Sequence, residues 1–354
     1  MIEQKKIFII IPKYKVGGAE RVMVSIANEL IKYNLKVFFI TLTKSHKIIL
    51  NKKIQLINLE SKKVINSVFK LKNMINKHKP DVCFSTISHT NIALYLASKL
   101  SKHKSQIFLR ESNNLFESIN NQNFLYKYIF LKLIKFVYKN TNLITPSIEL
   151  SQKVKKIFQI DKKINSISNP ILIKKFKYNI KKKFDFINIG SLTYQKDHIT
   201  LLKAFKIANL KKRKLKLVII GEGNLKKKIL EYILNNKLKN DVKILGNTKD
   251  INKYLNNSKS FILSSRYEGY PNVLLDAAIA KIPIISTNCK FGPSEILEKG
   301  KYGRMFKVGD YLKLSKIMLL NTKIIKKIPN AKLKKNKLNL ITKEYYELFF
   351  KKNI

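Results

Sequence analysis

Several residue types that define whole classes of protein are scarce in this sequence. Its 354 residues include two cysteines, 11 glycines, 8 prolines and no tryptophan. The two cysteines, Cys83 and Cys289, stand in unrelated contexts, which excludes a disulfide framework or a cysteine-based metal site and fits a reducing compartment. The first apolar run, Ile7–Ile11, is too short for a signal peptide, and no run reaches the roughly 18 residues of a membrane span. We therefore expect a cytoplasmic protein, soluble or peripheral on the inner face of the cytoplasmic membrane.

Acidic residues are scarce as well, with 22 Asp and Glu against 72 Lys and Arg and a formal net charge of +50. Such an excess suits a nucleic-acid-binding protein when it gathers on one face beside a recognisable reading motif. Here only five of the basic residues are arginine, and the lysines are spread along the whole chain among abundant Ile and Asn, a pattern typical of AT-rich codon usage. We therefore expect no nucleic-acid partner, although a positive surface would attract phosphorylated substrates or an anionic membrane surface.

Short apolar runs alternate with segments of helical period along two stretches of the chain. This alternation predicts parallel sheets covered by helices on both faces, hence two Rossmann-like domains at 1–170 and 184–330. A lysine-rich linker, 171–183, would join them, and a helix within 331–354 would pack back across the first domain. Because ligands bind beyond the carboxyl ends of such strands, the expected site is a central cleft that the two sheets face.

The predicted strands are Ile7–Ile11, Val37–Thr41, Ile54–Leu59, Val82–Ser85, Gln106–Arg110, Leu143–Thr145, Phe186–Ile189, Leu215–Ile220, Val242–Leu245, Ser260–Leu263 and Ile284–Ser286. The predicted helices are Ala19–Tyr33, Val68–Lys77, Asn91–Leu100, Phe124–Lys139, Ile199–Ile207, Asn224–Asn235, Ile251–Asn256, Asn272–Ala280 and Lys335–Lys351.

The strongest motif follows the predicted strand that ends at Leu263. Glu268 stands in the turn, Gly-x-Pro-Asn leads into a helix, and Asp276 comes eight residues after Glu268. Eight helical residues turn about 800°, roughly 80° beyond two full turns, so the two carboxylates share one side of the element and could hold two parts of one ligand. The alternative is a capping acid plus an exposed helix acid, which would explain either residue singly.

Four further glycine turns stand at predicted strand ends. They are Gly17-Gly18-Ala19-Glu20, Gly190-Ser191 with Lys196, Gly221-Glu222-Gly223, and Gly292-Pro293-Ser294-Glu295. Glycines let a backbone approach a ligand closely, and free N–H groups at a helix start can receive phosphate oxygens. A lysine at such a strand end can neutralise a diphosphate. Taken singly, each turn could equally be an ordinary tight connection, and Lys196 a solvated loop lysine.

Together and in this order, these motifs resemble glycosyltransferase family 4, the glycosyl transferases group 1, which are retaining enzymes with the GT-B fold. The landmarks of the resemblance are Gly17 to Glu20, Asn169-Pro170, Gln195-Lys196, Gly221 to Gly223, Glu268 to Asp276, and Gly303 after Glu295. The resemblance implies that the first domain binds the acceptor and the second binds a nucleotide sugar. It also implies that no metal or other cofactor is tightly bound.

The resemblance assigns roles to individual residues. Lys196 would meet the diphosphate, Glu268 the donor sugar and Asp276 the ribose, with Lys196 and Glu268 as the catalytic pair. Gly17 and Gly18 would lie near the phosphates, supported by the helix that begins near Ser294. The complete set of expected donor-binding residues is Gly17, Gly18, Ser191, Lys196, Gly221, Gly223, Arg266, Glu268, Gly269, Asp276 and Ser294.

Three departures from the family pattern affect this assignment. Ser191 stands where the family commonly has an arginine, so one cationic contact to the diphosphate is either missing or supplied elsewhere, with Arg266 as the candidate. Asp276 replaces the usual glutamate and reaches about one methylene less far. The stretch Arg110-Glu111-Ser112-Asn113-Asn114 lacks the histidine found in many members, which leaves His89, Arg110 and Glu111 as acceptor-side candidates.

The function implied is retaining transfer of a hexose or N-acetylhexosamine, most simply from a UDP-sugar, to a saccharide or lipid-linked saccharide in polysaccharide, lipopolysaccharide or capsule biosynthesis. Aromatic residues alternate with lysines along 124–139, which suits either a membrane interface or an ordinary two-faced helix. A nucleotide-sugar epimerase on the same architecture is the alternative enzyme, and a nucleic-acid-binding protein is the alternative outside enzymes.

Overall fold

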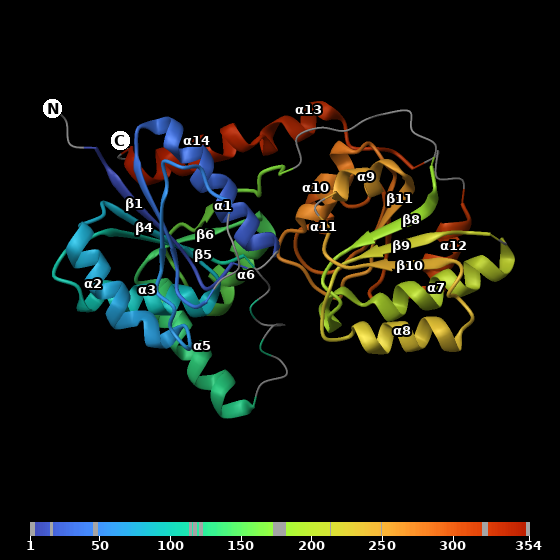
Figure 1. The fold of residues 1–354 in the computed structure, drawn as a ribbon, viewed down its shortest axis with the longest axis horizontal. Helices are drawn as coiled ribbons and strands as arrows, with labels where there is room; N and C mark the ends of the chain where they lie inside the picture. The colour runs from blue at the N-terminus through green and yellow to red at the C-terminus, as the bar shows by residue number, and fades with distance from the viewer. Residues whose placement is uncertain are drawn as a thin grey trace. The chain divides into compact units, whose positions relative to one another are not determined.

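The computed structural model describes residues 4–14, 17–44, 49–112, 115, 119, 123–172, 182–212, 214–248, 250–320 and 325–351. The chain forms two units (Figure 1): Met1–Leu172 together with Asn336–Ile354, and Ile173–Lys335. These borders lie close to the domain limits expected from the sequence. Most of the predicted linker, 173–181, lies outside the described residues.

Unit 1 (Met1–Leu172 and Asn336–Ile354) contains one parallel sheet with the order β3-β2-β1-β4-β5-β6-β7. Its central strands are runs of β-branched and aromatic residues buried on both faces, and Ile9 of β1 pairs with Phe39 on one side and Phe84 on the other. The strands are β1 (Lys6–Ile11), β2 (Lys36–Thr41), β3 (Gln55–Asn58), β4 (Val82–Thr86), β5 (Gln106–Arg110), β6 (Asn142–Thr145) and β7 (Asn165–Ser166).

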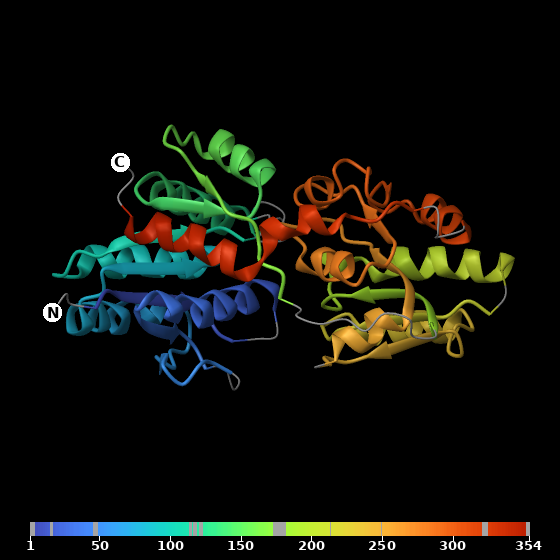
Figure 2. The same ribbon diagram turned by 90° about the horizontal axis from the view of Figure 1, so that it is seen from above.

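The helices of unit 1 form two groups. The first group is the pair α1 and α14, which lie side by side (Figure 2), and the second contains α2, α3, α5 and α6, which contact one another in sequence. The bounds are α1 (Gly18–Leu30), α2 (Val68–His78), α3 (Ser88–Leu100), α5 (Phe124–Lys139), α6 (Ile148–Phe158) and α14 (Leu338–Phe350), with short 3₁₀ turns η1 (Ile31–Tyr33) and η2 (Ile65–Ser67).

The C-terminal helix α14 completes the core of unit 1. Tyr345 and Phe349 are buried against Phe84 and Phe108, with ring centroids 4.7 to 5.3 Å apart. The Arg110 Nε–H at the end of β5 donates a hydrogen bond to the Tyr345 hydroxyl at 3.0 Å. A helix that is remote in sequence is thereby held by both packing and a charged hydrogen bond.

Unit 2 (Ile173–Lys335) contains a second parallel sheet, with the order β10-β9-β8-β11-β12-β13. Its strands are β8 (Phe184–Ile189), β9 (Leu217–Ile220), β10 (Val242–Leu245), β11 (Ser258–Leu263), β12 (Ile284–Thr287) and β13 (Arg304–Phe306). Its helices are α7 (His198–Lys211), α8 (Lys226–Asn235), α9 (Ile251–Asn256), α10 (Asn272–Ile279), α11 (Pro293–Ile296), α12 (Tyr311–Leu319) and α13 (Asn330–Leu333). The 3₁₀ turn η3 (Tyr194–Lys196) lies between β8 and α7, and η5 (Lys334–Asn336) directly follows α13.

All the predicted strands are present, with bounds that move by two residues at most. The sequence missed β7 and β13, which are edge strands of two and three residues and too short to produce a periodic pattern. It also missed α6, whose start is fixed locally because the Ser147 hydroxyl accepts the N–H of Leu150. The helices α12 and α13 were not predicted either, whereas the helix expected near Ser294 is present as α11.

In each sheet the strand order reverses around the first strand. β1 lies between β2 and β4, and β8 lies between β9 and β11. Connections leave these neighbouring strands in opposite directions, which opens a ligand-binding position beyond their carboxyl ends. The motifs named above follow β1, β8, β9, β11 and β12 at these ends. Within the described ranges, no helix has both the length and the apolar character needed to cross a bilayer.

The Arg110–Tyr345 hydrogen bond predicts a measurable contribution to the stability of unit 1. Tyr345→Phe keeps the ring but leaves a buried guanidinium N–H without its acceptor, so the free energy of unfolding should fall by about 1.5–3 kcal/mol. Urea unfolding followed by circular dichroism measures this change. Tyr346→Phe is the matched control, because that hydroxyl forms no hydrogen bond with the described part of the chain. Equal effects of the two variants would contradict the prediction.

Candidate functional site

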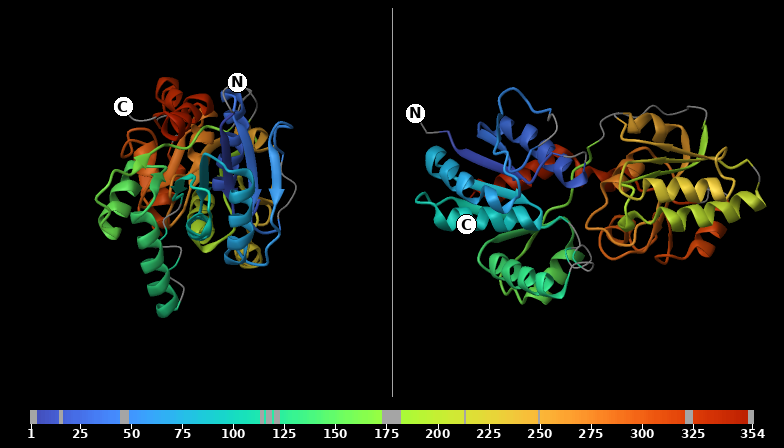
Figure 3. Two further views of the ribbon diagram at one scale, coloured as in Figure 1. Left: turned by 90° about the vertical axis from the view of Figure 1, so that its left-hand side faces the viewer. Right: turned by 60° about the horizontal axis from the view of Figure 1, so that its bottom comes forward.

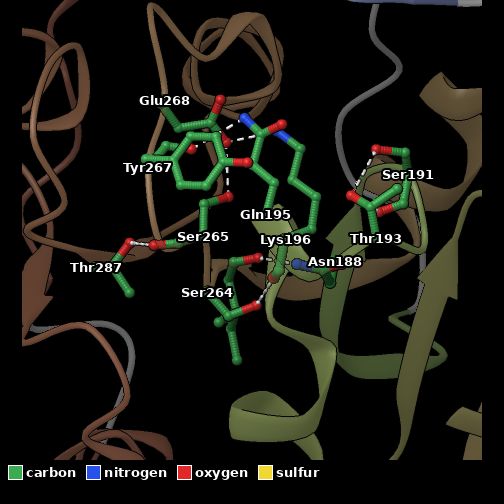
Figure 4. A network of polar contacts seen from close by, with 11 residues as sticks. Asn188, Ser191, Thr193, Gln195, Lys196, Ser264, Ser265, Tyr267, Glu268 and Thr287 are labelled. Atoms are coloured by element: carbon green, nitrogen blue, oxygen red, sulfur yellow. Dashed lines mark hydrogen bonds and ion pairs between the residues drawn. The ribbon is translucent and has the colours of Figure 1, made fainter. Parts of the chain in front are cut away.

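The core of the candidate site is an ion pair between Lys196 and Glu268 (Figure 4). Lys196 ends the turn after β8, and Glu268 follows β11, 72 residues later in the sequence. The Lys196 Nζ lies 2.5 Å from Glu268 Oε1, and the Ser265 hydroxyl donates to the same oxygen at 2.6 Å. The carboxylate is only 5% exposed. Lys196 is therefore not the solvated loop lysine of the alternative interpretation.

Backbone and side-chain hydrogen bonds hold the two loops together. The N–H of Arg266 donates to the Gln195 carbonyl at 2.8 Å, and the Gln195 amide donates to the Tyr267 carbonyl at 3.0 Å. The Ser264 hydroxyl donates to the Lys196 carbonyl at 2.8 Å. Because both loops follow adjacent parallel strands, β8 and β11, this bracing fixes the ion pair at the carboxyl edge of the sheet.

Arg266 lies beside the ion pair and is held by the start of α7. Its guanidinium is 2.9 Å from the carboxylate of Asp197 and stacks over the ring of Tyr194 at 4.5 Å. Asp197 also accepts the Thr200 hydroxyl at 2.9 Å and caps α7. The hydroxyl of Ser191, which stands where the family commonly has arginine, lies 3.4 Å from the Thr193 hydroxyl. Arg266 is thus a second cation near Lys196.

His198 is a component of the site that sequence reasoning missed. It directly follows Asp197, opens α7 and is buried. Burial, with a smaller contribution from the charge of Lys196, lowers the pKa of His198 to about 4. Neither ring nitrogen has a hydrogen-bond partner among the described residues. His198 is therefore a neutral ring at physiological pH and adds no charge beside Lys196. Its position in the sequence, directly after Lys196 and Asp197, could have marked it as a site candidate.

Gly221 and Gly223 allow close packing of one loop on another. A Cβ on Gly221 would lie 2.0 Å from the Gly190 carbonyl oxygen, and one on Gly223 would lie 2.3 Å from the Leu192 carbonyl oxygen. The N–H of Leu192 donates to the Glu222 carbonyl at 2.9 Å across the same contact. The need for glycine here is explained by the loop that carries Ser191, whereas the sequence suggested close approach to a ligand. Ligand contact by these glycines stays a prediction.

Asp276 lies within α10 and is 1% exposed. The alternative that it is an ordinary exposed helix acid is therefore wrong. The turn of Gly269 that precedes α10 packs against the turn that carries Ser294: Gly292 has φ +80°, and a Cβ there would lie 2.5 Å from the Pro271 ring. Glu268, Gly269 and Ser294 thus belong to two adjoining turns of unit 2, and Asp276 belongs to the helix that follows the first of them.

The glycine turn of unit 1 opens α1. Gly17 is the N-cap and Gly18 the first helical residue, while Val16 lies outside the described residues. A Cβ on Gly17 would lie 2.4 Å from a carboxylate oxygen of Glu20, so glycine is favoured here by a contact within the turn itself. A role near phosphates stays a prediction for both glycines.

Two acceptor-side candidates, Arg110 and Glu111, are engaged inside unit 1. Both are 1% exposed. Arg110 bonds to Tyr345 and also to Ser112 and Asn169. Glu111 accepts hydroxyl donors from two helices, Ser88 of α3 at 2.7 Å and Tyr138 of α5 at 2.5 Å. Burial and the Glu111 charge hold the pKa of Tyr138 well above its usual value. These contacts give Arg110 and Glu111 a structural role; Asn113 and Asn114 lie outside the described residues.

The third acceptor-side candidate, His89, lies in the first turn of α3 beyond β4. The preceding Ile87 has φ +74°, an uncommon conformation for a β-branched residue and one that is concentrated at functional sites. His89 Nε2 and the Tyr126 hydroxyl are 2.9 Å apart, and the imidazole lies 4.8 Å from the Phe130 ring. Burial lowers the pKa of His89.

The described residues contain neither an activated cysteine nor a cluster of metal-ligating side chains. Cys83 and Cys289 are both free and buried, and burial raises the pKa of each thiol to about 12, with the Glu268 charge adding to the effect at Cys289. Neither is activated as a nucleophile. Across the described ranges, no group of three or more His, Cys, Asp and Glu side chains could hold a metal ion.

Comparison with known families assigns both halves of the chain. Residues 171–336 match the family described as Glycosyl transferases group 1, and residues 16–174 match Glycosyltransferase Family 4. An uncharacterized glycosyltransferase of Methanocaldococcus jannaschii is 33% identical over 255 residues, which is 66% of this chain and 62% of that protein.

A second relative comes from Campylobacter jejuni: an N-acetylgalactosamine-N,N'-diacetylbacillosaminyl-diphospho-undecaprenol 4-alpha-N-acetylgalactosaminyltransferase. It is 30% identical over 184 residues, which is 50% of this chain and 49% of the relative. The chain thus spans about three fifths of the archaeal relative and about half of the Campylobacter protein.

Among solved structures, a mutant of TarM from S. aureus in complex with fondaparinux, alpha-GlcNAc-glycerol and UDP superposes with a TM-score of 0.80. It shares 15% sequence identity, and the match covers 98% of this chain and 100% of TarM. This likeness establishes the fold of the whole chain, two parallel-sheet α/β domains of the GT-B type. With both halves matched by family and the complete chain matched by fold, this protein belongs to the group 1, family 4 glycosyltransferases.

Proposed function

We propose that this protein transfers a hexose or N-acetylhexosamine, with retention, from a UDP-sugar to a saccharide or lipid-linked saccharide in cell-surface glycan biosynthesis. The observation that carries the proposal is the ion pair between half-buried Lys196 and buried Glu268 at the carboxyl ends of β8 and β11, in the half that matches the group 1 family. Both residues occupy the position where open α/β sheets bind ligands.

Lys196 would act on the leaving group. When the bond between sugar C1 and the diphosphate oxygen breaks, negative charge grows on that oxygen, and a fixed ammonium in a poorly solvated site stabilises it. Arg266 lies close enough to the same loop to take the role of the cation that Ser191 does not provide. A diphosphate would then compete with Glu268 for Lys196 and with Asp197 for Arg266.

Glu268 would bind the sugar, and Asp276 the ribose. A carboxylate accepts two hydroxyl hydrogen bonds without being protonated, and Ser265 orients one of the Glu268 oxygens. In retaining transfer the new bond from C1 to the acceptor oxygen forms on the face that the diphosphate leaves. The acceptor proton passes to the departing phosphate oxygen, so no separate protein base is required.

The comparisons support the choice of substrates. The TarM complex contains UDP, which favours a UDP-linked donor for a chain of the same fold. The Campylobacter relative acts, by its name, on a diphospho-undecaprenol-linked saccharide, which favours a lipid-linked acceptor. Work on such an acceptor would place the protein peripherally at the inner face of the cytoplasmic membrane.

We predict that Lys196→Ala and Glu268→Ala each reduce transfer about a hundredfold or more, because each removes one half of the pair that faces the reacting centre. Transfer from UDP-N-acetylhexosamine to a prenyl-diphosphate saccharide measures the effect. Lys259→Ala is the matched control: Lys259 pairs with Asp185 at 2.8 Å on the same two strands but at their opposite ends. Full activity in both folded site variants would sink the assignment, and epimerisation of the donor without acceptor would favour the alternative enzyme.

Donor selectivity is predicted to appear as a thermal shift. Because a ligand that binds only the folded state stabilises it by mass action, UDP at about 100 times its Kd should add about 2.7 kcal/mol. ADP, GDP and dTDP should shift the melting temperature less, and Lys196→Ala should abolish the UDP effect. A shift produced by ADP or GDP but not by UDP would contradict the proposed donor.

Metal independence is predicted from the family resemblance and has its own test. Transfer should continue unchanged in excess EDTA, because Lys196 and neighbouring groups would neutralise the diphosphate without a cation. Loss of transfer in EDTA that added Mg²⁺ or Mn²⁺ restores would show that a metal accompanies the donor.

A further inference from the structure

A large cavity lies within unit 1, and all of its described lining residues belong to that unit. Its volume is about 970 Å³, near the upper end of the roughly 300–1,000 Å³ typical of ligand pockets. The residues that follow β1, β2, β3 and β4 line it, including Pro12, Thr43, Ser61 and His89. The cavity therefore lies at the carboxyl edge of the sheet, where ligands bind in this class of fold.

The two sides of the cavity differ in chemistry. One wall is apolar and comes from η2, α3 and α5, with Ile65, Ile92, Ile129, Phe130 and Leu133. Among the described residues, the segments that follow β1, β2 and β3 also contribute to the lining four lysines and one acid, Glu60. The lysines are Lys13, Lys44, Lys62 and Lys63, and none of them forms an ion pair with a carboxylate of the described chain.

The apolar wall continues onto the surface along α5. This helix extends well beyond the sheet in two perpendicular views (Figures 1 and 3). Its N-terminal half exposes Phe124, Leu125, Tyr128 and Ile129, and Ile129 also lines the cavity. Exposed apolar surface of this extent marks an interaction site. An occupant that matches all of these surfaces has an anionic head and an apolar chain longer than the cavity.

A polar pair stands at the apolar wall near the sheet. His89 and Tyr126 are hydrogen-bonded at 2.9 Å, and both line the cavity. This pair can bind a hydroxyl or phosphate oxygen where the anionic and apolar parts of an amphiphile meet. Inorganic phosphate or a free sugar would leave the apolar wall unused, and a hydrocarbon would leave four lysines unpaired.

We propose that this cavity binds the lipid part of the acceptor as a prenyl phosphate, with its phosphate on Lys13, Lys44, Lys62 and Lys63 and its chain on the α5 wall. The inference rests on the proposed function, because it gives the lipid-linked acceptor a site in unit 1, whereas the proposed donor loops belong to unit 2. The proposed occupant is a single lipid phosphate molecule. A bilayer surface that contacts α5 without entering the cavity is the competing outcome.

Calorimetric titration of the full-length chain with farnesyl phosphate, below its aggregation concentration, tests the proposal. Farnesyl phosphate should bind more tightly than either farnesol or inorganic phosphate, because only it engages both sides of the cavity. The double variant Lys62→Ala/Lys63→Ala should weaken binding of farnesyl phosphate and leave that of farnesol unchanged. Lys259→Ala, which removes a lysine from unit 2, is the charge control.

A pair of variants on α5 separates the cavity from a membrane surface. Ile129→Glu places a carboxylate on the apolar wall and should weaken farnesyl phosphate binding about tenfold or more. Phe136→Glu is matched to it, because both residues are on α5, both are 56% exposed, and Phe136 does not line the cavity. Phe136→Glu should bind farnesyl phosphate like the unmodified protein.

Two results would overturn the proposal. Equal losses in Ile129→Glu and Phe136→Glu would assign the effect to the exposed helix face, and absence of farnesyl phosphate binding would remove the cavity as the lipid site. UDP stabilisation is measured in the same samples. If UDP stabilises the protein while farnesyl phosphate does not bind, the lipid inference alone fails; if UDP has no effect, the proposed function fails.

Discussion

The ion pair between Lys196 and Glu268 is the interaction on which the rest of unit 2 depends for its chemistry. Glu268 is buried, and a buried charge that loses its partner is strongly destabilised, so this carboxylate needs a donor such as half-buried Lys196. An incoming diphosphate can take Lys196 only if Glu268 gains other donors, and sugar hydroxyls beside Ser265 would provide them. Under the proposed function, this geometry would couple binding of the phosphate part and the sugar part of one donor.

Several of the protein's few acidic residues are buried and have defined partners. Glu268, Asp197, Glu111 and Asp276 are all nearly inaccessible, although the chain has only 22 acidic residues. Asp197 fixes the start of α7 and pairs with Arg266, while Glu111 joins two helices through Ser88 and Tyr138. Because 72 basic residues face only 22 acids in the sequence, most lysines of the described residues have no carboxylate partner. The large positive charge is thus available to anionic ligands, and the lysines of the unit 1 cavity are one local instance.

Strand order brings these groups together in both units. Parallel strands deliver all their carboxyl ends to one edge, so residues separated by 72 positions, as Lys196 and Glu268 are, become neighbours when β8 and β11 pair. In unit 1 the edge beyond β1 to β4 carries the cavity instead. Tyr345, from the far end of the chain, completes the core of that unit through Arg110, which is why a residue predicted to face an acceptor is occupied internally.

Much of this could be predicted from the sequence, because the periodicity of apolar residues and the position of glycine turns are local properties. The bounds of every long strand were predicted to within two residues. The sequence also predicted that Lys196, Glu268 and the glycine turns follow strand ends, and that Asp276 lies in the helix after Glu268. Contacts between distant residues could not be predicted in this way. Only the tertiary structure decided that Lys196 pairs with Glu268, that Asp276 is buried, that Gly221 and Gly223 accommodate the Gly190–Leu192 loop, and that His198 is neutral. The physical reason is that burial and charge pairing depend on which strands become neighbours, whereas a single sequence specifies where each strand ends.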